Sequence, residues 1–234
     1  MEKDELLKSI KGRLIISCQA LPGEPLYDGD RSLMPYMAEA AKRAGSPLIR
    51  TNSIRDVIGI KNTTGLPVIG LIKKQYEGYE PYITPTMAEV DALALAGADI
   101  IALDMTDRIR GDGLTSVQFF KSVRKKYPER IFLADISTVE EGKAAASAGA
   151  DLVSTTMSGY TAESPKLEGP DFRLVETLVK EVNVPILAEG RIHTPEDAVK
   201  MLKLGAYAVI VGGAITRPLE IAQRFMNAVN EAAS

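Results

Sequence analysis

The sequence has one cysteine (Cys18), one histidine (His193) and no tryptophan. A single cysteine cannot form a disulfide bond within the chain. A single histidine argues against a metal site built on several imidazoles, and against a histidine pair acting as acid and base. Lysine and arginine total 28 against 31 aspartate and glutamate residues, which gives a formal net charge of −3. No basic stripe stands out of the kind that binds nucleic acid, so we do not expect nucleic acid as a partner.

Long apolar runs are also absent. Residues 1–7 are charged and lack the apolar segment of a secretory signal. The apolar stretch 206–215 is among the longest, and it is far below the roughly 20 residues that span a bilayer. We therefore expect no membrane insertion and a cytoplasmic protein.

What the sequence does contain is an alternation of short apolar runs and longer helical patterns. The runs are rich in Val, Ile and Leu, as is typical of parallel strands buried on both faces. They cover residues 13–18, 47–51, 67–73, 99–104, 130–135, 151–155, 185–189 and 207–211. The helical patterns cover residues 32–44, 53–63, 86–96, 115–126, 138–148, 170–182, 194–204 and 217–233.

A weak internal repeat supports this interpretation. Gly45, Gly97, Gly149 and Gly205 each stand between a helical pattern and the next apolar run, at spacings of 52, 52 and 56 residues. Two βα units fill such an interval, and a glycine there suits a left-handed helix end. Its role is therefore structural.

Eight βα units predict an α/β fold, a single-domain (β/α)8 TIM barrel over residues 1–234. The alternative is a doubly wound open sheet. That fold usually carries a glycine-rich dinucleotide turn after its first strand. Residues 17–25 read SCQALPGEP, which is no such turn.

In such barrels the chemistry lies at the carboxyl ends of the strands. Every predicted strand ends in a polar group or a glycine, which favours a site at that mouth over a purely structural barrel. These ends are Gln19, Arg50, Lys73, Lys74, Asp104, Asp135, Thr155, Thr156, Glu189, Gly190, Arg191, Gly212 and Gly213.

The last two strand ends predict a phosphate site. The loops after strands seven and eight form the recurrent phosphate site of this fold. Here they carry Gly190, Gly212 and Gly213, which let backbone N–H groups approach an anion, and Arg217 opens the last helical pattern. The alternative is that the glycines only make a tight turn and Arg217 is solvated.

Lys73 and Lys74 end an otherwise apolar run. Consecutive strand residues point to opposite faces, so only one of them can face the mouth of the barrel. Burial lowers the pKa of a lysine and makes it a usable base or nucleophile. Cys18 also ends a strand, and we interpret it as a small buried hydrophobic residue.

Four strings match one family: SCQALPGEPL at 17–26, GLIKK at 70–74, TTMSGYT at 155–161 and AEGR at 188–191. They resemble the N-acylglucosamine-6-phosphate 2-epimerases, also called N-acetylmannosamine-6-phosphate 2-epimerases, of bacterial sialic-acid catabolism. The resemblance runs from the first strand to the last helix. This chain differs from the family in loop details, with Met157 where Leu is commoner and Gly111 where Pro is usual, which bears on loop contacts by Arg108 or Arg110.

The resemblance implies interconversion of N-acetylmannosamine 6-phosphate and N-acetylglucosamine 6-phosphate, by removal and return of a proton at carbon 2. It implies a small-molecule sugar phosphate as partner, no metal or redox cofactor, and a homodimer. Its site residues fall as follows: catalytic Lys73, Glu189 and Asp135; substrate-binding Gln19 and Arg50; phosphate-binding Gly190, Gly212, Gly213 and Arg217.

The chemistry agrees with these residue types. Proton removal needs a base with a pKa near the working pH, the enolate needs a cation such as Arg50, and either Asp135 or Glu189 suits ring opening. Whether one base or two act stays open. The alternatives are another phosphate-binding barrel isomerase, lyase or decarboxylase, or a non-catalytic sugar-phosphate sensor. Residues 156–169 are the best candidate for a lid.

Overall fold

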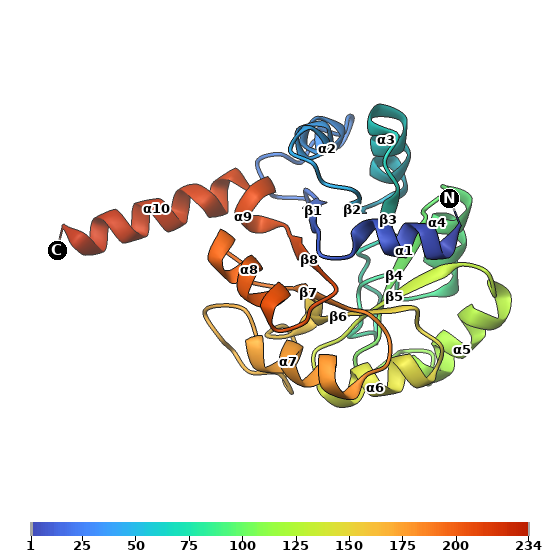
Figure 1. The fold of residues 1–234 in the computed structure, drawn as a ribbon. Helices are drawn as coiled ribbons and strands as arrows, with labels where there is room; N and C mark the ends of the chain where they lie inside the picture. The colour runs from blue at the N-terminus through green and yellow to red at the C-terminus, as the bar shows by residue number, and fades with distance from the viewer. Residues whose placement is uncertain (1, 234) are drawn as a thin grey trace.

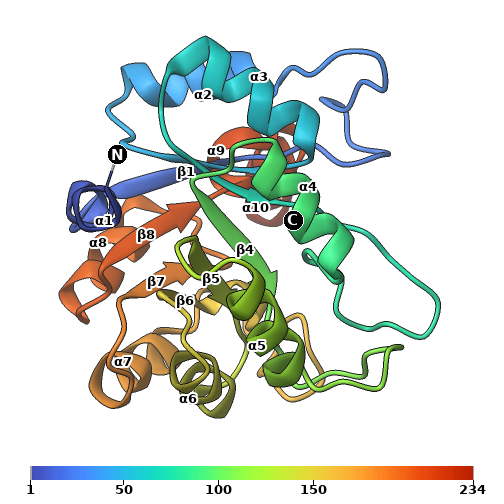
Figure 2. The same cartoon turned by 90° about the vertical axis from the view of Figure 1, so that its right-hand side faces the viewer.

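The computed structural model describes residues 2–233, so Met1 and Ser234 of the expected range 1–234 lie outside the described residues. Eight parallel strands form a closed barrel in the order of the sequence, and β8 pairs with β1, as Figures 1 and 2 show. The (β/α)8 prediction is confirmed. The strands are β1 (Leu14–Cys18), β2 (Ile49–Asn52), β3 (Val68–Leu71), β4 (Ile100–Asp104), β5 (Ile131–Asp135), β6 (Leu152–Ser154), β7 (Ile186–Glu189) and β8 (Ala208–Val211).

Helices surround this barrel, and the eight predicted helical patterns all form helices. The α-helices are α1 (Lys3–Ile10), α2 (Met34–Arg43), α3 (Ile54–Thr64), α4 (Met87–Leu95), α5 (Ser116–Lys126), α6 (Val139–Ser147), α7 (Phe172–Glu181), α8 (Pro195–Lys203), α9 (Gly213–Thr216) and α10 (Pro218–Ala232). A 3-10 helix, η1 (Thr155–Met157), follows β6.

The alternation of side chains along each strand produces two cores. One set of strand residues, including Ile49 and Phe132, packs against the surrounding helices. The other set, including Ile69 and Leu187, packs with Leu6 and Ile10 of α1. Because successive strand residues face opposite sides of a sheet, this second set fills the interior of the barrel, and α1 closes its N-terminal end.

Local sequence explains where many helices begin and end. The hydroxyl groups of Thr138 and Thr194 each accept a hydrogen bond from the backbone N–H of the third helical residue. The acidic side chain of that third residue accepts a hydrogen bond from the backbone N–H of the threonine, which makes a capping box. The four repeated glycines have positive φ angles, from 78° at Gly97 to 99° at Gly205. The predicted left-handed helix ends are confirmed.

Two boundaries that bear on the pocket differ from those expected, and three short helices were not expected. β3 ends at Leu71 instead of Lys73, because Lys73 leaves the barrel ladder and forms an antiparallel bridge with Ile83. The last helix begins at Pro218, with Arg217 just before it. The helices α1, η1 and α9 were not expected, since each is too short to show a clear hydrophobic period.

The last helix, α10, does not cover the barrel. It projects away from the rest of the molecule (Figure 1), and none of its described residues is buried. Within residues 2–233, no helix has the length and apolar character needed to cross a membrane.

Candidate active site

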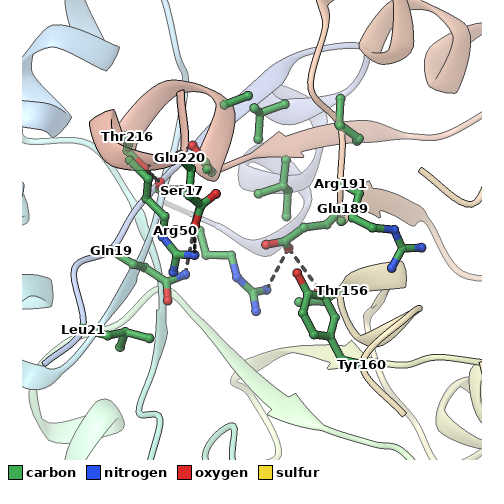
Figure 3. A pocket seen from close by; sticks show the side chains of 18 of the residues that line it. Ser17, Gln19, Leu21, Arg50, Thr156, Tyr160, Glu189, Arg191, Thr216 and Glu220 are labelled. Carbon is green, nitrogen blue, oxygen red and sulfur yellow. Dashed lines mark hydrogen bonds and ion pairs between the residues drawn. The ribbon is translucent and has the colours of Figure 1, made fainter. Parts of the chain in front are cut away.

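A pocket of about 350 Å³ lies at the carboxyl ends of the strands (Figure 3). Every residue that we predicted for the site lines this pocket except Asp135. Three other members of the wider ring of strand ends also lie outside it, namely Lys74, Asp104 and Thr155. The predicted lining residues are Gln19, Arg50, Lys73, Glu189, Gly190, Gly212, Gly213 and Arg217.

Lys73 and Lys74 follow β3, and their side chains lie in different environments. The N–H of Lys73 donates to Oδ1 of Asn52 at 2.8 Å, and its half-buried side chain lines the pocket. Burial, reinforced by the positive charges of Arg217 and Arg50, lowers the pKa of Lys73 to about 8. Lys74 is exposed and pairs with Glu89 at 3.5 Å. Only Lys73 therefore has the position and the acidity of a base near neutral pH.

Arg50 lies at the floor of the pocket and is fully buried. Its two terminal nitrogens donate to the two carboxylate oxygens of Asp135 at 3.0 and 2.7 Å. Burial favours the neutral form, but the charges of Asp135 and Glu189 outweigh it and raise the pKa of Arg50. This bidentate geometry holds the guanidinium in one orientation, so Arg50 is a fixed positive charge.

Glu189 ends β7 and lies 3.4 Å from Arg50, measured from Oε2 to the nearest guanidinium nitrogen. Thr155 fixes the backbone of Glu189 through two hydrogen bonds, of 2.8 and 3.0 Å. Burial raises the pKa of Glu189 above its usual range, although Arg50 opposes this effect. Glu189 is thus a carboxyl group at the pocket wall that holds a proton more readily than a solvated glutamate.

Thr156 connects the two acids. Its hydroxyl oxygen lies 2.6 Å from Oδ1 of Asp135 and 3.0 Å from Oε2 of Glu189. One hydroxyl proton can be donated to only one of them at a time. Asp135 has no exposed surface and does not line the pocket, so Thr156 and Arg50 lie between it and any ligand.

The predicted phosphate end of the pocket lies where β7 and β8 end. Gly190 has a φ of 106°, a conformation that favours glycine. Gly213 begins α9, and its N–H has no earlier residue of that helix to accept its hydrogen bond. Arg217 pairs here with two acids, Glu220 at 2.8 Å and Glu24 at 3.3 Å.

Several lining residues escaped the sequence analysis: Ser17, Leu21, Glu24, Tyr82, Tyr160 and Glu220. Glu24 and Tyr160 lie within the matched strings but end no strand, which was the signal that we used. Tyr82 comes from the segment that folds back after Lys73, so nothing in its local sequence marks it.

Gln19 also lines the pocket. Its amide nitrogen donates to Oγ of Ser17 at 2.8 Å, while its Oε1 is buried without a hydrogen-bond partner. A buried acceptor of this kind suits a hydroxyl or amide N–H of a ligand. Among residues 2–233, no group of three or more His, Cys, Asp or Glu side chains is placed to hold a metal ion.

The arrangement combines a lysine of lowered pKa, the half-buried carboxyl group of Glu189, a fixed guanidinium and glycine-rich loops at two neighbouring strand ends. A base, an acid and an anion cradle that line the same pocket suit proton transfer on a small phosphorylated molecule. Cys18 is buried, and burial raises the pKa of its thiol to about 12, in line with the structural role expected for it.

Comparison with known proteins agrees with this chemistry. Residues 34–231 match the family model described as "Putative N-acetylmannosamine-6-phosphate epimerase". A protein of Caldanaerobacter subterraneus subsp. tengcongensis, described as "Putative N-acetylmannosamine-6-phosphate 2-epimerase", is 55% identical over 97% of this chain and 95% of its own. A protein of Clostridioides difficile with the same description is 46% identical over 96% of this chain and 99% of its own.

Solved structures show the same relationship. The N-acetylmannosamine-6-phosphate 2-epimerase from Clostridium perfringens has a TM-score of 0.90 and 48% identity, covering 95% of this chain and 96% of its own. A thiamine phosphate pyrophosphorylase from Pyrococcus furiosus, at 16% identity and a TM-score of 0.60 over 93% of each chain, shares the fold alone. The sequence and the structure together show that the chain belongs to the N-acetylmannosamine-6-phosphate epimerase family.

Proposed function

We propose that this protein interconverts N-acetylmannosamine 6-phosphate and N-acetylglucosamine 6-phosphate by inverting carbon 2. The observation that carries the proposal is Lys73, whose pKa falls to about 8 in a pocket that it shares with Glu189. The names of the relatives support the choice of substrate.

The proton at carbon 2 is acidic only while carbon 1 is a carbonyl, in the ring-opened sugar. Neutral Lys73 removes this proton through Nζ, and the electron pair of the C–H bond moves into the enolate. The guanidinium of Arg50, fixed by Asp135, stabilises the negative charge on the enolate oxygen. Glu189 acts as the acid partner, since burial favours its protonated form.

We propose for Asp135 a different role from the one suggested by the resemblance. Both of its carboxylate oxygens accept hydrogen bonds from Arg50, and its side chain has no exposed surface. We assign it to positioning Arg50. This leaves Glu189 as the carboxyl group for ring opening and proton return.

The phosphate binds at Gly190, Gly212, Gly213 and Arg217, where the loops after β7 and β8 meet. This handle supplies binding energy away from carbon 2. Gln19 contacts the sugar through its unpaired Oε1.

The test is isotope exchange. Purified protein incubated with N-acetylmannosamine 6-phosphate in D₂O should form N-acetylglucosamine 6-phosphate and wash deuterium into carbon 2, as read by proton NMR. Glu189→Gln should lower kcat by roughly 10²–10⁴ while the sugar phosphate still binds. Binding without exchange in the wild type would identify the protein as a sugar-phosphate sensor instead.

We also propose a homodimer in which α10 of each chain packs against the other. Phe225, Met226 and Val229 are exposed on the projecting α10, and an apolar helix face of this kind is stabilised by burial. The cytoplasmic location and the single domain over 1–234 stay predictions from the sequence.

A further inference from the structure

Arg191, just after Gly190 in the AEGR string, has an unusual backbone. Its φ is 53°, and the only other non-glycine residues with positive φ in the described chain are Ser53 and Thr84. The left-handed conformation is unfavourable for a non-glycine residue, because its Cβ lies too close to the following carbonyl oxygen. Such a conformation persists where the surrounding contacts hold it, so the contacts of Arg191 indicate why it is there.

The Arg191 guanidinium bridges the two ends of one loop. Its Nε donates to the carbonyl of Gly169 at 2.8 Å, and Nη1 donates to the carbonyl of Ser158. These two carbonyls bracket residues 158–169, which connect η1 to α7. Figure 3 shows the Arg191 side chain pointing away from the centre of the pocket, so these contacts and not a ligand occupy it.

The loop is shaped to receive this guanidinium. A Cβ at Gly159 would lie 1.6 Å from Nη1 of Arg191, so only glycine admits the side chain there. Ser158 is anchored in turn, since its hydroxyl donates to Asp171, the N-cap residue of α7, at 3.0 Å. Lys166 donates to the carbonyl of Gly159 at 2.8 Å. Residues 158–169 are therefore fastened at both ends, which differs from a freely moving lid.

The same loop carries Tyr160 to the pocket. Tyr160 is exposed and lines the pocket together with Glu189 and Arg191. In Figure 3 its ring reaches into the pocket with the hydroxyl directed towards Glu189. The Arg191 side chain thus holds the loop that carries Tyr160. The Arg191 backbone belongs to the turn that follows Glu189.

We propose that Arg191 is a positioning residue that clamps residues 158–169 and thereby holds Tyr160 against the bound sugar phosphate, where the Tyr160 hydroxyl hydrogen-bonds to a sugar oxygen. The contact to substrate rests on the proposed function; the clamp does not. Lysine at position 191 has one nitrogen and lacks the planar fork that reaches both carbonyls. Arg191→Lys should therefore release the loop while keeping the charge.

The clamp is tested first by hydrogen–deuterium exchange of the unliganded protein. Arg191→Lys should raise the exchange of backbone amides within 159–169 by at least tenfold, and leave the amides of β4 and β5 unchanged. The control is Arg173→Lys on α7, where the arginine is exposed and the same change should have no effect. Unchanged exchange in 159–169 in Arg191→Lys would overturn the clamp whether or not the protein is an epimerase.

The link to Tyr160 is tested by a double-mutant cycle on the epimerase reaction. Tyr160→Phe and Arg191→Lys should each raise KM by roughly threefold to tenfold, the loss of about one hydrogen bond, with a smaller change in kcat. The KM of the double variant should be no higher than that of the more impaired single variant, because a Tyr160 that is already displaced has no contact left to lose. Fully additive effects would show that Arg191 does not act through Tyr160. An inactive wild type would instead contradict the proposed function and leave the exchange result to decide the clamp.

Discussion

Lys73 and Lys74 are neighbours in the chain with opposite electrostatic environments. Lys73 faces Arg50 and Arg217 from a half-buried position, and its pKa falls to about 8. Lys74 lies over the ring of Tyr76 at 4.6 Å and beside Glu89, and these partners raise its pKa. A base must be neutral to accept a proton. The environment therefore makes Lys73 suitable as a base and Lys74 unsuitable.

The pH dependence of the reaction should report this difference. Below its pKa, Lys73 is protonated and cannot take the proton from carbon 2. We therefore expect kcat/KM to rise with pH, with a midpoint near 8, well below the value of about 10.4 for a free lysine. Lys73→Ala should abolish deuterium exchange at carbon 2, whereas Lys74→Ala should keep most of the activity. A Lys73→Ala enzyme that still exchanges deuterium would rule out this assignment.

Arg217 shares its charge between two acids, and this sharing has a measurable consequence. Arg217→Ala should raise KM by roughly tenfold to a hundredfold, since a charge-assisted hydrogen bond to phosphate contributes about 1.5–3 kcal/mol. Glu220→Gln should lower KM. It removes a carboxylate that competes for Arg217 at 2.8 Å, and exposed pairs of this kind contribute about 0.2–1 kcal/mol.

Steady-state kinetics on the two Glu variants of α10 would check this expectation. Glu220→Gln should lower KM by up to about fivefold and lower the inhibition constant of inorganic phosphate in parallel. Glu231→Gln, with the same change of charge at an exposed position further along α10, should leave both constants as they are. A raised KM in Glu220→Gln would mean that Glu220 supports the phosphate site instead of competing with it.

At the scale of elements, α1 shows how a short helix contributes to a barrel. Leu6 and Ile10 are buried against strand residues such as Leu133 and Leu187. The carbonyl of Leu7 accepts a hydrogen bond from the hydroxyl of Tyr207 at 3.0 Å. The helix precedes β1, so it closes the end of the barrel opposite the pocket.

Substitutions in α1 should therefore lower the stability of the protein without changing its catalysis. Ile10→Ala leaves a cavity at a fully buried position, and such changes cost about 2–5 kcal/mol. We expect a lower free energy of unfolding in urea with an unchanged KM for the folded enzyme. Lys8→Ala, on the exposed side of α1, is the matched control and should unfold like the wild type.

At the scale of the whole molecule, the position of α10 is the unusual feature. In a (β/α)8 barrel the helix after the last strand belongs to the outer ring, yet here it extends away from the barrel (Figure 1). Its main contacts are with the short α9. Phe225, Met226 and Val229 expose 60–71% of their surfaces, and water contact at that apolar area is unfavourable.

The proposed dimer predicts that a charge on this face dissociates it. Phe225→Glu should convert a dimer into a monomer in analytical ultracentrifugation at micromolar concentration, because burying a carboxylate without a partner is costly. Gln223→Glu adds the same charge at an exposed polar position and should stay dimeric. A wild type that is monomeric under these conditions would contradict the dimer.

Local pattern was enough for the architecture. The eight apolar runs, the threonine caps and the glycine ends predicted each strand and each helix of the βα repeat, because burial on both faces and capping are local demands on the sequence. The same pattern predicted the mouth of the barrel as the place of the site. It missed α1, since eight residues with two buried side chains leave little period to detect.

The tertiary structure decided which strand ends reach a ligand. Lys73, Glu189 and Asp135 look alike in the sequence, as charged residues after apolar runs, but Asp135 is closed off by Arg50 and Thr156. The lowered pKa of Lys73 and the raised pKa of Glu189 arise from burial and from charges that lie far away in the chain. Such effects depend on the closed barrel, which brings residues 50, 73, 135 and 189 together; no local pattern encodes them.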